Sequence, residues 1–260
     1  MWKAGQLFDL RGRRAIVTGG TRGLGSAIAK CLLENGCHVA ALSRHPAAIP
    51  ELETGAAENG ARLITTACDV TDAPSCAAAV ASVTAAFGGV DILVNCAGML
   101  ALAFIDEMDD DAWRRTIDAN LTGAFFMTRE VSKVMRGQGR GRIIHMSSMK
   151  GMLGTSKMGY SAYCASKGGV NMLTKQAAAE LGRYGITVNA IAPSFIETDM
   201  NRVVLEKDGY REKLAARIPV GRIGQLEDLF GLVLLLVSDA SAFISGQVIC
   251  LDGGLSAAQE

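Results

Sequence analysis

The sequence predicts a doubly wound α/β domain with a seven-stranded parallel sheet flanked by helices. Short runs rich in Val and Ile alternate with Ala-rich segments of helical period along the 260 residues, which is typical of successive βα units. A Gly-rich turn follows the first of these runs. No Pro/Ser-rich linker and no repeat of solenoid period interrupts the alternation. We therefore expect residues 1–260 to form one domain.

Each expected strand is a short run of β-branched and apolar residues. The seven runs are Arg14–Thr18, His38–Ser43, Arg62–Ala67, Ile92–Asn95, Arg142–Met146, Thr187–Ile191 and Val248–Leu251. The helices expected between them are Ser26–Asn35, Cys76–Phe87, about Asp110 to Met135, Tyr163–Gly182 and Gln225–Ser238. Gly36 follows the first helix as a usual C-cap. The irregular residues 194–224 are too many for an ordinary connection, so we expect them to form a substrate lid.

Composition excludes several classes of function. The 26 basic and 26 acidic residues are interspersed, so no basic surface for nucleic acid is expected. The longest apolar stretch, Leu229–Val237, is well short of the ~20 residues that span a bilayer. The amino-terminal residues lack the apolar core of a signal peptide, and the seven cysteines form no CxxC pair. These features predict a cytoplasmic protein without a membrane or nucleic-acid partner.

Histidine spacing gives no sign of a metal site. His38, His45 and His145 are far apart in the sequence, and none stands in a pattern such as HExxH. We therefore expect no bound metal.

The segment Thr18–Gly25, with the sequence TGGTRGLG, lies between the first strand and the first helix. Glycines in such a turn let backbone N–H groups approach a pyrophosphate, which the helix dipole also stabilises. The alternative is an ordinary tight βα turn, but the strand before it and the helix after it favour nucleotide binding. The residues expected to contact the nucleotide are Gly19, Thr21, Arg22, Gly23, Leu24 and Gly25.

Further motifs follow in a fixed order. They are the strand end Asn95-Cys96-Ala97-Gly98, Asn120 in DANLTG, Ser148 after the strand RIIHM, Tyr163 and Lys167 in YCASK, Pro193–Thr198, and Leu251–Gly254. Together with the TGxxxGxG turn, this order and spacing resembles the short-chain dehydrogenase/reductase family over essentially the whole chain. Two residues depart from its pattern: Cys96 replaces an Asn and Ser194 replaces a Gly.

The resemblance implies a Rossmann fold that binds a nicotinamide dinucleotide. It implies adenine contacts from Asp69 and Val70. It also implies contacts along the rest of the cofactor from Asn95, Ala97, Gly98, Tyr163, Lys167, Pro193, Ile196 and Thr198.

The second strand ends in Leu42-Ser43-Arg44, where the family reads the adenosine ribose. An acidic residue there selects NAD, whereas basic residues accept the 2′-phosphate of NADP. Ser43 stands at the acidic position, and Arg44 and Arg22 could form a cationic clamp on a phosphate. The alternative is that both arginines are solvated surface residues. Without the acidic residue, the pattern favours NADP, and NAD is the less favoured cofactor.

Reduction of a ketone requires a proton donor at the carbonyl oxygen. Tyr163 and Lys167 share one helix face because they are four residues apart, and a neighbouring ammonium group is expected to lower the pKa of the phenol. Ser148 would bind the substrate oxygen, and the resemblance implies that Asn120 anchors a water that links Lys167 to solvent. Tyr160 has no cation four residues on and is assigned to the pocket rim, while strand alternation turns Ser147 away from the site.

We therefore expect an NADP(H)-dependent oxidoreductase that interconverts a secondary alcohol and a ketone. Lys150 and Lys157 follow Ser148, so the substrate is expected to be small and polar, of the sugar-acid or polyol type, if one of these lysines faces the pocket. The lid arginines Arg202, Arg211, Arg217 and Arg222 would then close over it. The alternatives are a 3-oxoacyl thioester reductase and a catalytically silent NADP-binding regulatory module. The apolar helix Gln225–Ser238 and the family resemblance predict a homotetramer.

Overall fold

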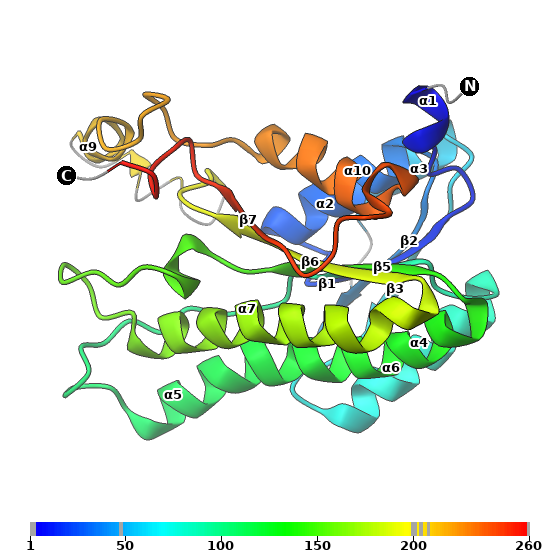
Figure 1. The fold of residues 1–260 in the computed structure, drawn as a ribbon, viewed down its shortest axis with the longest axis horizontal. Coiled ribbons are helices and arrows are strands. Elements are labelled where there is room, and N and C mark those ends of the chain that lie inside the picture. The colour runs from blue at the N-terminus through cyan, green and yellow to red at the C-terminus, as the bar shows by residue number, and fades with distance from the viewer. Residues whose placement is uncertain (1–3, 47–48, 199–201, 203–204, 207–208, 259–260) are drawn as a thin grey trace.

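The computed structural model describes residues 4–46, 49–198, 202, 205–206 and 209–258. Its centre is a seven-stranded parallel sheet with the order β3-β2-β1-β4-β5-β6-β7 (Figure 1). The strands are β1 (Arg14–Thr18), β2 (His38–Ser43), β3 (Leu63–Ala67), β4 (Ile92–Asn95), β5 (Gly141–Met146), β6 (Ile186–Pro193) and β7 (Val248–Leu251). The predicted doubly wound fold is confirmed.

Strand order reverses beside β1, which pairs with β2 on one side and with β4 on the other. Thr18 at the end of β1 lies opposite both Leu42 and Asn95 in the register. The carboxyl ends of all strands therefore meet at one edge of the sheet. In sheets of this kind the crevice at the reversal is where ligands bind.

Helices cover both faces of the sheet (Figure 1). One face carries α2 (Gly23–Glu34), α3 (Pro50–Glu58) and α10 (Phe230–Val237). The other carries α4 (Ala73–Phe87), α6 (Gly123–Gln138) and α7 (Ser161–Leu181), with α5 (Asp110–Ile117) leading into α6. The short α1 (Ala4–Leu7) precedes β1, and α9 (Tyr210–Ala215) lies near the carboxyl end of the described chain.

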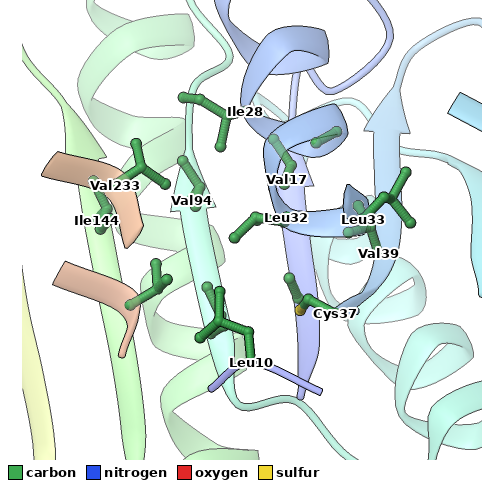
Figure 2. Close-up of a cluster of buried hydrophobic side chains, with 14 of the residues drawn as sticks. Leu10, Val17, Ile28, Leu32, Leu33, Cys37, Val39, Val94, Ile144 and Val233 are labelled. Carbon is green, nitrogen blue, oxygen red and sulfur yellow. The ribbon is translucent and has the colours of Figure 1, made fainter. Parts of the chain in front are cut away.

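The core follows the two-residue period of the strands. Val17, Val94 and Ile144 point to the α2 side, where they pack with Ile28 and Leu32 of α2 and with neighbouring apolar residues (Figure 2). The intervening strand residues belong to a second buried cluster on the opposite face, with α4 and α6. This two-sided burial explains why the strands read as continuous apolar runs in the sequence.

The helix expected from Asp110 to Met135 runs without a break from Asp110 to Gln138 and contains a π-helical turn. This turn, over Asp118–Thr122, lies between α5 and α6. The nine-residue α3 was not expected, because its polar composition provides only a weak helical period. Pro50 in its first turn is a typical start signal that could have indicated it. No helix in the described part of the chain is both long and apolar enough to cross a membrane.

The described part of residues 194–224 packs against the carboxyl-terminal turn. Leu205, Leu214, Ile218 and Ile223 form a buried cluster of their own, against which Leu255 packs. A parallel bridge between Ile196 and Gly224 closes the base of the segment. Residues 199–201, 203–204 and 207–208 of the expected lid lie outside the described residues. Whether the segment opens and closes as a lid remains a prediction.

Candidate active site

Four expected catalytic residues meet near the carboxyl ends of β4 and β5. Ser148 follows β5, Tyr163 and Lys167 lie in α7, and Asn120 lies in the π-helical turn. The hydroxyl of Ser148 lies close enough to the phenol of Tyr163 to lower its pKa. The Lys167 Nζ atom lies 5.6 Å from the centroid of the Tyr163 ring. The fold thus gathers a hydroxyl, a phenol and an amine from segments distant in sequence.

The phenol of Tyr163 is held in a largely apolar setting. Burial raises its pKa above the ordinary value, and the nearby Ser148 hydroxyl opposes that rise. This corrects the expectation of a lowered pKa for the protein alone, because desolvation of the phenolate outweighs the favourable contacts. The phenol is therefore protonated at neutral pH and ready to donate its proton.

The amine of Lys167 is buried and donates a hydrogen bond to the Met146 carbonyl oxygen at 2.7 Å. Burial lowers the pKa of Lys167 to about 8. An amine with this pKa loses and gains its proton readily near neutral pH. Lys167 is therefore suited to return a proton to Tyr163.

The Asn120 side chain binds the backbone that follows β4. Its Oδ1 accepts from the Met99 N–H at 2.7 Å, while its Nδ2 donates to the Met99 carbonyl at 2.9 Å and to Ser166 Oγ at 3.0 Å. Both side-chain N–H groups are used in this way. The contacts favour a positioning role for the side chain, and its expected link to a water remains a prediction.

Ser147 and Tyr160, which could be confused with Ser148 and Tyr163 in the sequence, lie outside the catalytic group. The Ser147 hydroxyl donates a buried hydrogen bond of 2.6 Å to Asn171 Oδ1 of α7. Ser148, and not Ser147, therefore faces the phenol of Tyr163. The ring of Tyr160 lies 6.2 Å from that of Tyr163, and its hydroxyl contacts the Met158 sulfur at 3.6 Å. Tyr160 thus lies at the rim of the site, where the Lys150 Nζ atom lies 5.4 Å from its ring centroid.

The Gly-rich turn lies beside the end of β4. Gly19 has a φ of +64°, and a Cβ atom there would lie 3.1 Å from the Ala97 Cα atom. A Cβ atom at Gly25 would overlap the Gly19 carbonyl. Only glycine allows this close return of the chain, which leaves a bare backbone surface at the start of α2.

Thr18 was not among the expected cofactor residues, yet it shapes this turn. Its Oγ1 accepts hydrogen bonds from the backbone N–H groups of Cys96 at 3.0 Å and Ala97 at 3.1 Å. The side chain therefore joins the ends of β1 and β4 across the reversal of strand order. Thr18 directly precedes the first glycine of the motif, and this position could have indicated its role from the sequence.

The end of β2 carries the residues expected to read the ribose of the cofactor. Within the described residues, the Ser43 hydroxyl is buried without a hydrogen-bond partner. Arg22 and Arg44 are exposed, and neither guanidinium forms a hydrogen bond or an ion pair with a described residue. The contacts expected from Ser43, Arg22 and Arg44 to a cofactor remain predictions.

Asp69 and Val70 follow β3 at the same edge of the sheet. The Asp69 carboxylate accepts hydrogen bonds from the Thr71 side chain at 2.7 Å and the Thr71 N–H at 2.9 Å, which lower the pKa of Asp69; the Arg44 charge lowers it further. The Asp69 carboxylate is thus held by Thr71, and its expected contact with the adenine remains a prediction.

The Asn95 side chain points away from the nucleotide turn. Its Nδ2 donates to the Ala124 carbonyl at 3.3 Å and to Thr128 Oγ1 at 3.2 Å in α6. The expected cofactor contact of Asn95 remains a prediction. Strand alternation turns Asn95 to the face of the sheet that α6 covers.

The remaining expected cofactor residues follow the strand ends. Ala97 and Gly98 extend from β4, and a Cβ atom at Gly98 would meet the Asn120 Oδ1 atom at 2.8 Å. Pro193 ends β6, and Ile196 and Thr198 follow it at the base of the 194–224 segment. Their contacts with a cofactor remain predictions.

Comparison with known proteins agrees with this geometry. The sequence model of the family described as "Enoyl-(Acyl carrier protein) reductase" matches residues 19–256. Gluconate 5-dehydrogenase of Gluconobacter oxydans (strain 621H) is 35% identical over 250 residues, which cover 96% of this chain and 97% of that protein. The chain belongs to the short-chain dehydrogenase/reductase family.

Two further members of this family are similar over nearly their full lengths. Acetoacetyl-CoA reductase of Shinella zoogloeoides is 40% identical, with 93% of this chain and 98% of that protein covered. The crystal structure of a gluconate 5-dehydrogenase from Burkholderia cenocepacia J2315 in complex with NADP and tartrate is 34% identical with a TM-score of 0.88. That comparison covers 99% of this chain and 100% of the other. The chain is therefore an oxidoreductase of this family.

Proposed function

We propose that this protein is an NADP(H)-dependent oxidoreductase that interconverts a secondary alcohol and a ketone. The observation that carries the proposal is that the Ser148 hydroxyl and the Lys167 amine both lie beside the phenol of Tyr163. A bound nicotinamide dinucleotide would supply or accept the hydride. A carbonyl oxygen placed between Ser148 and Tyr163 would accept hydrogen bonds from both hydroxyl groups. Tyr163 would donate its proton to that oxygen during reduction, and Lys167 would restore it.

The preference for NADP rests on the end of β2. Ser43 offers an unsatisfied hydroxyl where a carboxylate would repel a phosphate, and Arg22 and Arg44 lie free at the expected ribose site. A charge-assisted hydrogen bond from a guanidinium to a phosphate is worth roughly 1.5–3 kcal/mol. The NADP complex of the Burkholderia cenocepacia relative supports the same cofactor.

The substrate is proposed to be small and polar, of the sugar-acid or polyol type. The Lys150 Nζ atom lies 5.4 Å from the centroid of the Tyr160 ring, at the rim of the site, and burial lowers the pKa of Lys150. Arg217 is close enough for its charge to lower that pKa further. Two cations beside the reacting hydroxyl groups suit a carboxylate or hydroxyl groups on the substrate. The relatives named gluconate 5-dehydrogenase support this class.

The other lid arginines are less suited to bind substrate. Arg211 forms a bidentate ion pair with Glu197 at 2.7 and 2.9 Å, and Arg222 forms one with Asp228 at 2.6 and 2.8 Å. Arg202 also lies 3.6 Å from the Glu197 carboxylate. These pairs correct the expectation of four arginines closing over the substrate, because the guanidinium groups bind carboxylates of the fold itself. Arg217 remains as the lid cation nearest to Lys150.

A specific observation favours a second candidate, a 3-oxoacyl thioester reductase. Leu100, Leu102, Phe104 and Ile105 are exposed on the segment after β4. This segment adjoins the site, because Ala103 forms a parallel bridge with Tyr160. An exposed apolar segment here could receive an acyl chain. The acetoacetyl-CoA reductase relative supports this candidate. A silent regulatory module gains no such support, because all four expected catalytic residues are present.

A single assay separates these candidates. Oxidation of NADPH is followed at one enzyme concentration with keto-sugar acids, polyol ketones and acetoacetyl thioesters, with Tyr163→Phe as the inactive control. We expect higher kcat/KM values for the hydroxylated and carboxylated ketones. Efficient turnover of thioesters alone would establish the second candidate, and no turnover of any carbonyl compound would favour a silent module.

We also propose a homotetramer in the cytoplasm. Phe125 of α6 and Met172 of α7 expose large apolar side chains on the outer helices, as a subunit interface requires. All seven cysteines are free thiols, which suits a reducing compartment. A monomeric mass by light scattering at micromolar concentration would contradict the assembly.

A further inference from the structure

A second pocket lies at the amino ends of the central strands. It has a volume of about 160 Å³. Its lining residues are Arg13, Asp91, Ile92, Arg140, Gly141, Arg142, Val237 and Asp239. Because all strands are parallel, this pocket and the catalytic residues lie at opposite edges of the sheet. None of its residues takes part in the proposed reaction.

One wall of the pocket is built around Asp91, whose side chain is 2% exposed. Arg14 binds this carboxylate with two hydrogen bonds, from Nε at 2.7 Å and from Nη2 at 2.9 Å. Arg140 Nη2 also lies 3.1 Å from Asp91 Oδ1. The charge of Asp91 is therefore already balanced by Arg14, and Arg140 adds a positive charge.

In the opposite wall, the Asp239 carboxylate is also shared by two arginines. Arg13 Nη2 lies 2.8 Å from one oxygen of this carboxylate, and Arg142 Nη2 lies 3.1 Å from the other. Burial lowers the pKa of Arg142, and the charges of Arg13 and Arg140 lower it further, which shows that the three guanidinium groups are close enough to repel one another. Four arginines thus share two aspartates, so this cluster, in which Arg14 lies behind the pocket lining, has two more positive than negative charges among its described residues. Asp9, which also interacts with Arg13, is itself paired with Arg11 at 2.6 Å.

The available hydrogen-bond donors belong to the two arginines with the fewest contacts to described residues, Arg13 and Arg140. Arg142 is held in place by the carbonyl oxygens of Ser238 at 3.1 Å and Gly141 at 3.0 Å in addition to Asp239. Arg13 and Arg140 each contact one carboxylate among the described residues. A guanidinium group carries five N–H donors, so most donors of these two arginines are free to bind a ligand.

We propose that this pocket binds a small phosphate-class anion, either inorganic phosphate or the phosphate group of a monoester. Planar guanidinium forks match phosphate oxygens, and a dianion would balance the two excess charges. The volume equals that of roughly five liquid waters at ~30 Å³ each, which admits a phosphate group but not a whole nucleotide. Arg13 and Arg140 would bind the anion, with Arg142 as the fixed cation behind it.

The test uses intact protein saturated with NADPH, so that the proposed cofactor site cannot contribute phosphate binding. Inorganic phosphate is titrated at constant ionic strength by isothermal calorimetry, with the thermal midpoint as a second readout. Saturable binding is expected, weakened at least tenfold in Arg140→Gln, which leaves Arg14 to pair with Asp91. Arg114→Gln is the matched control, because Arg114 is an exposed arginine paired with aspartates on α5. It should bind phosphate as the unmodified protein does.

A second variant, which is expected to strengthen phosphate binding, shows whether a loss of binding could simply reflect misfolding. Asp239→Asn removes a negative charge from the half-exposed wall and should tighten phosphate binding. Titration with a phosphate monoester distinguishes the two ligand sources. Absence of saturable binding, or equal binding by Arg140→Gln and Arg114→Gln, would overturn the proposal. Carbonyl reduction by the same samples would report on the proposed function independently.

Discussion

The Lys167 Nζ atom lies 5.6 Å from the centroid of the Tyr163 ring and donates a 2.7 Å hydrogen bond to the Met146 carbonyl. The four-residue spacing on α7 places both side chains on one helix face, and the end of β5 supplies the acceptor that orients the amine. A helix and a strand end thus cooperate to hold a buried amine next to a buried phenol.

Substitution Tyr163→Phe should lower kcat by about 10²–10⁴-fold, because it removes the proton donor at the substrate oxygen. NADPH binding, measured by fluorescence titration, should change little. The matched control is Tyr160→Phe, which should retain most of the activity because that hydroxyl contacts only Met158 among the described residues. A greater loss in Tyr160→Phe than in Tyr163→Phe would show that the active-site tyrosine is misassigned.

The cofactor site should favour NADPH over NADH by at least ~10-fold in kcat/KM, since one charge-assisted hydrogen bond to the 2′-phosphate supplies about 1.5 kcal/mol. Arg44→Ala should narrow this preference by raising KM for NADPH and leaving KM for NADH nearly unchanged. Arg115→Ala, which alters an exposed arginine of α5, serves as the control. Equal kcat/KM values for the two nucleotides in the unmodified protein would refute NADP selectivity.

The substrate site should depend on Lys150. Lys150→Ala should raise KM for a carboxylated ketone about 10-fold, as expected for loss of a partly exposed charge-assisted contact, with a smaller effect for a neutral polyol ketone. Lys157→Ala is the natural control, because this exposed lysine belongs to the same loop. If both variants reduced the carboxylated ketone as well as the unmodified protein does, substrate recognition by Lys150 would be wrong.

Stability should fall in mild acid because of His145. This buried imidazole contacts Thr128 Oγ1 at 3.0 Å and Thr174 Oγ1 at 2.9 Å, and burial lowers its pKa from 6.5 to about 4. Between these values the unfolded chain binds the proton and the folded chain does not, so acidification from pH 7 to pH 4 should cost roughly 3 kcal/mol at ~1.4 kcal/mol per unit.

Urea unfolding at pH 7 and pH 4.5 measures this effect. His145→Gln should reduce the difference in unfolding free energy between the two pH values, whatever its effect at pH 7. His45→Gln, at an exposed position, should preserve the difference. An unchanged pH dependence in His145→Gln would show that this residue does not cause the acid sensitivity.

The sequence by itself determined the fold and the order of the chemical groups along it. The bounds of β1, β2, β4 and β7 agree with the predicted runs, because strands buried on both faces must be short, apolar and β-branched. The pairing of Tyr163 with Lys167 was equally predictable, because it depends only on helical periodicity. The turn from Thr18 to Gly25 was recognisable because its glycines allow local backbone conformations that other residues rarely adopt.

Only the tertiary structure decided which polar groups are free for function. Asn95 faces α6, Arg222 binds Asp228, and Lys150 lies beside the Tyr160 ring. The cluster of Arg13, Arg140 and Arg142 likewise forms only when the amino ends of β1 and β5 come together with the end of α10. The physical reason is that local periodicity determines which face a side chain occupies, whereas its partners are set by the packing of segments that can be more than 100 residues apart.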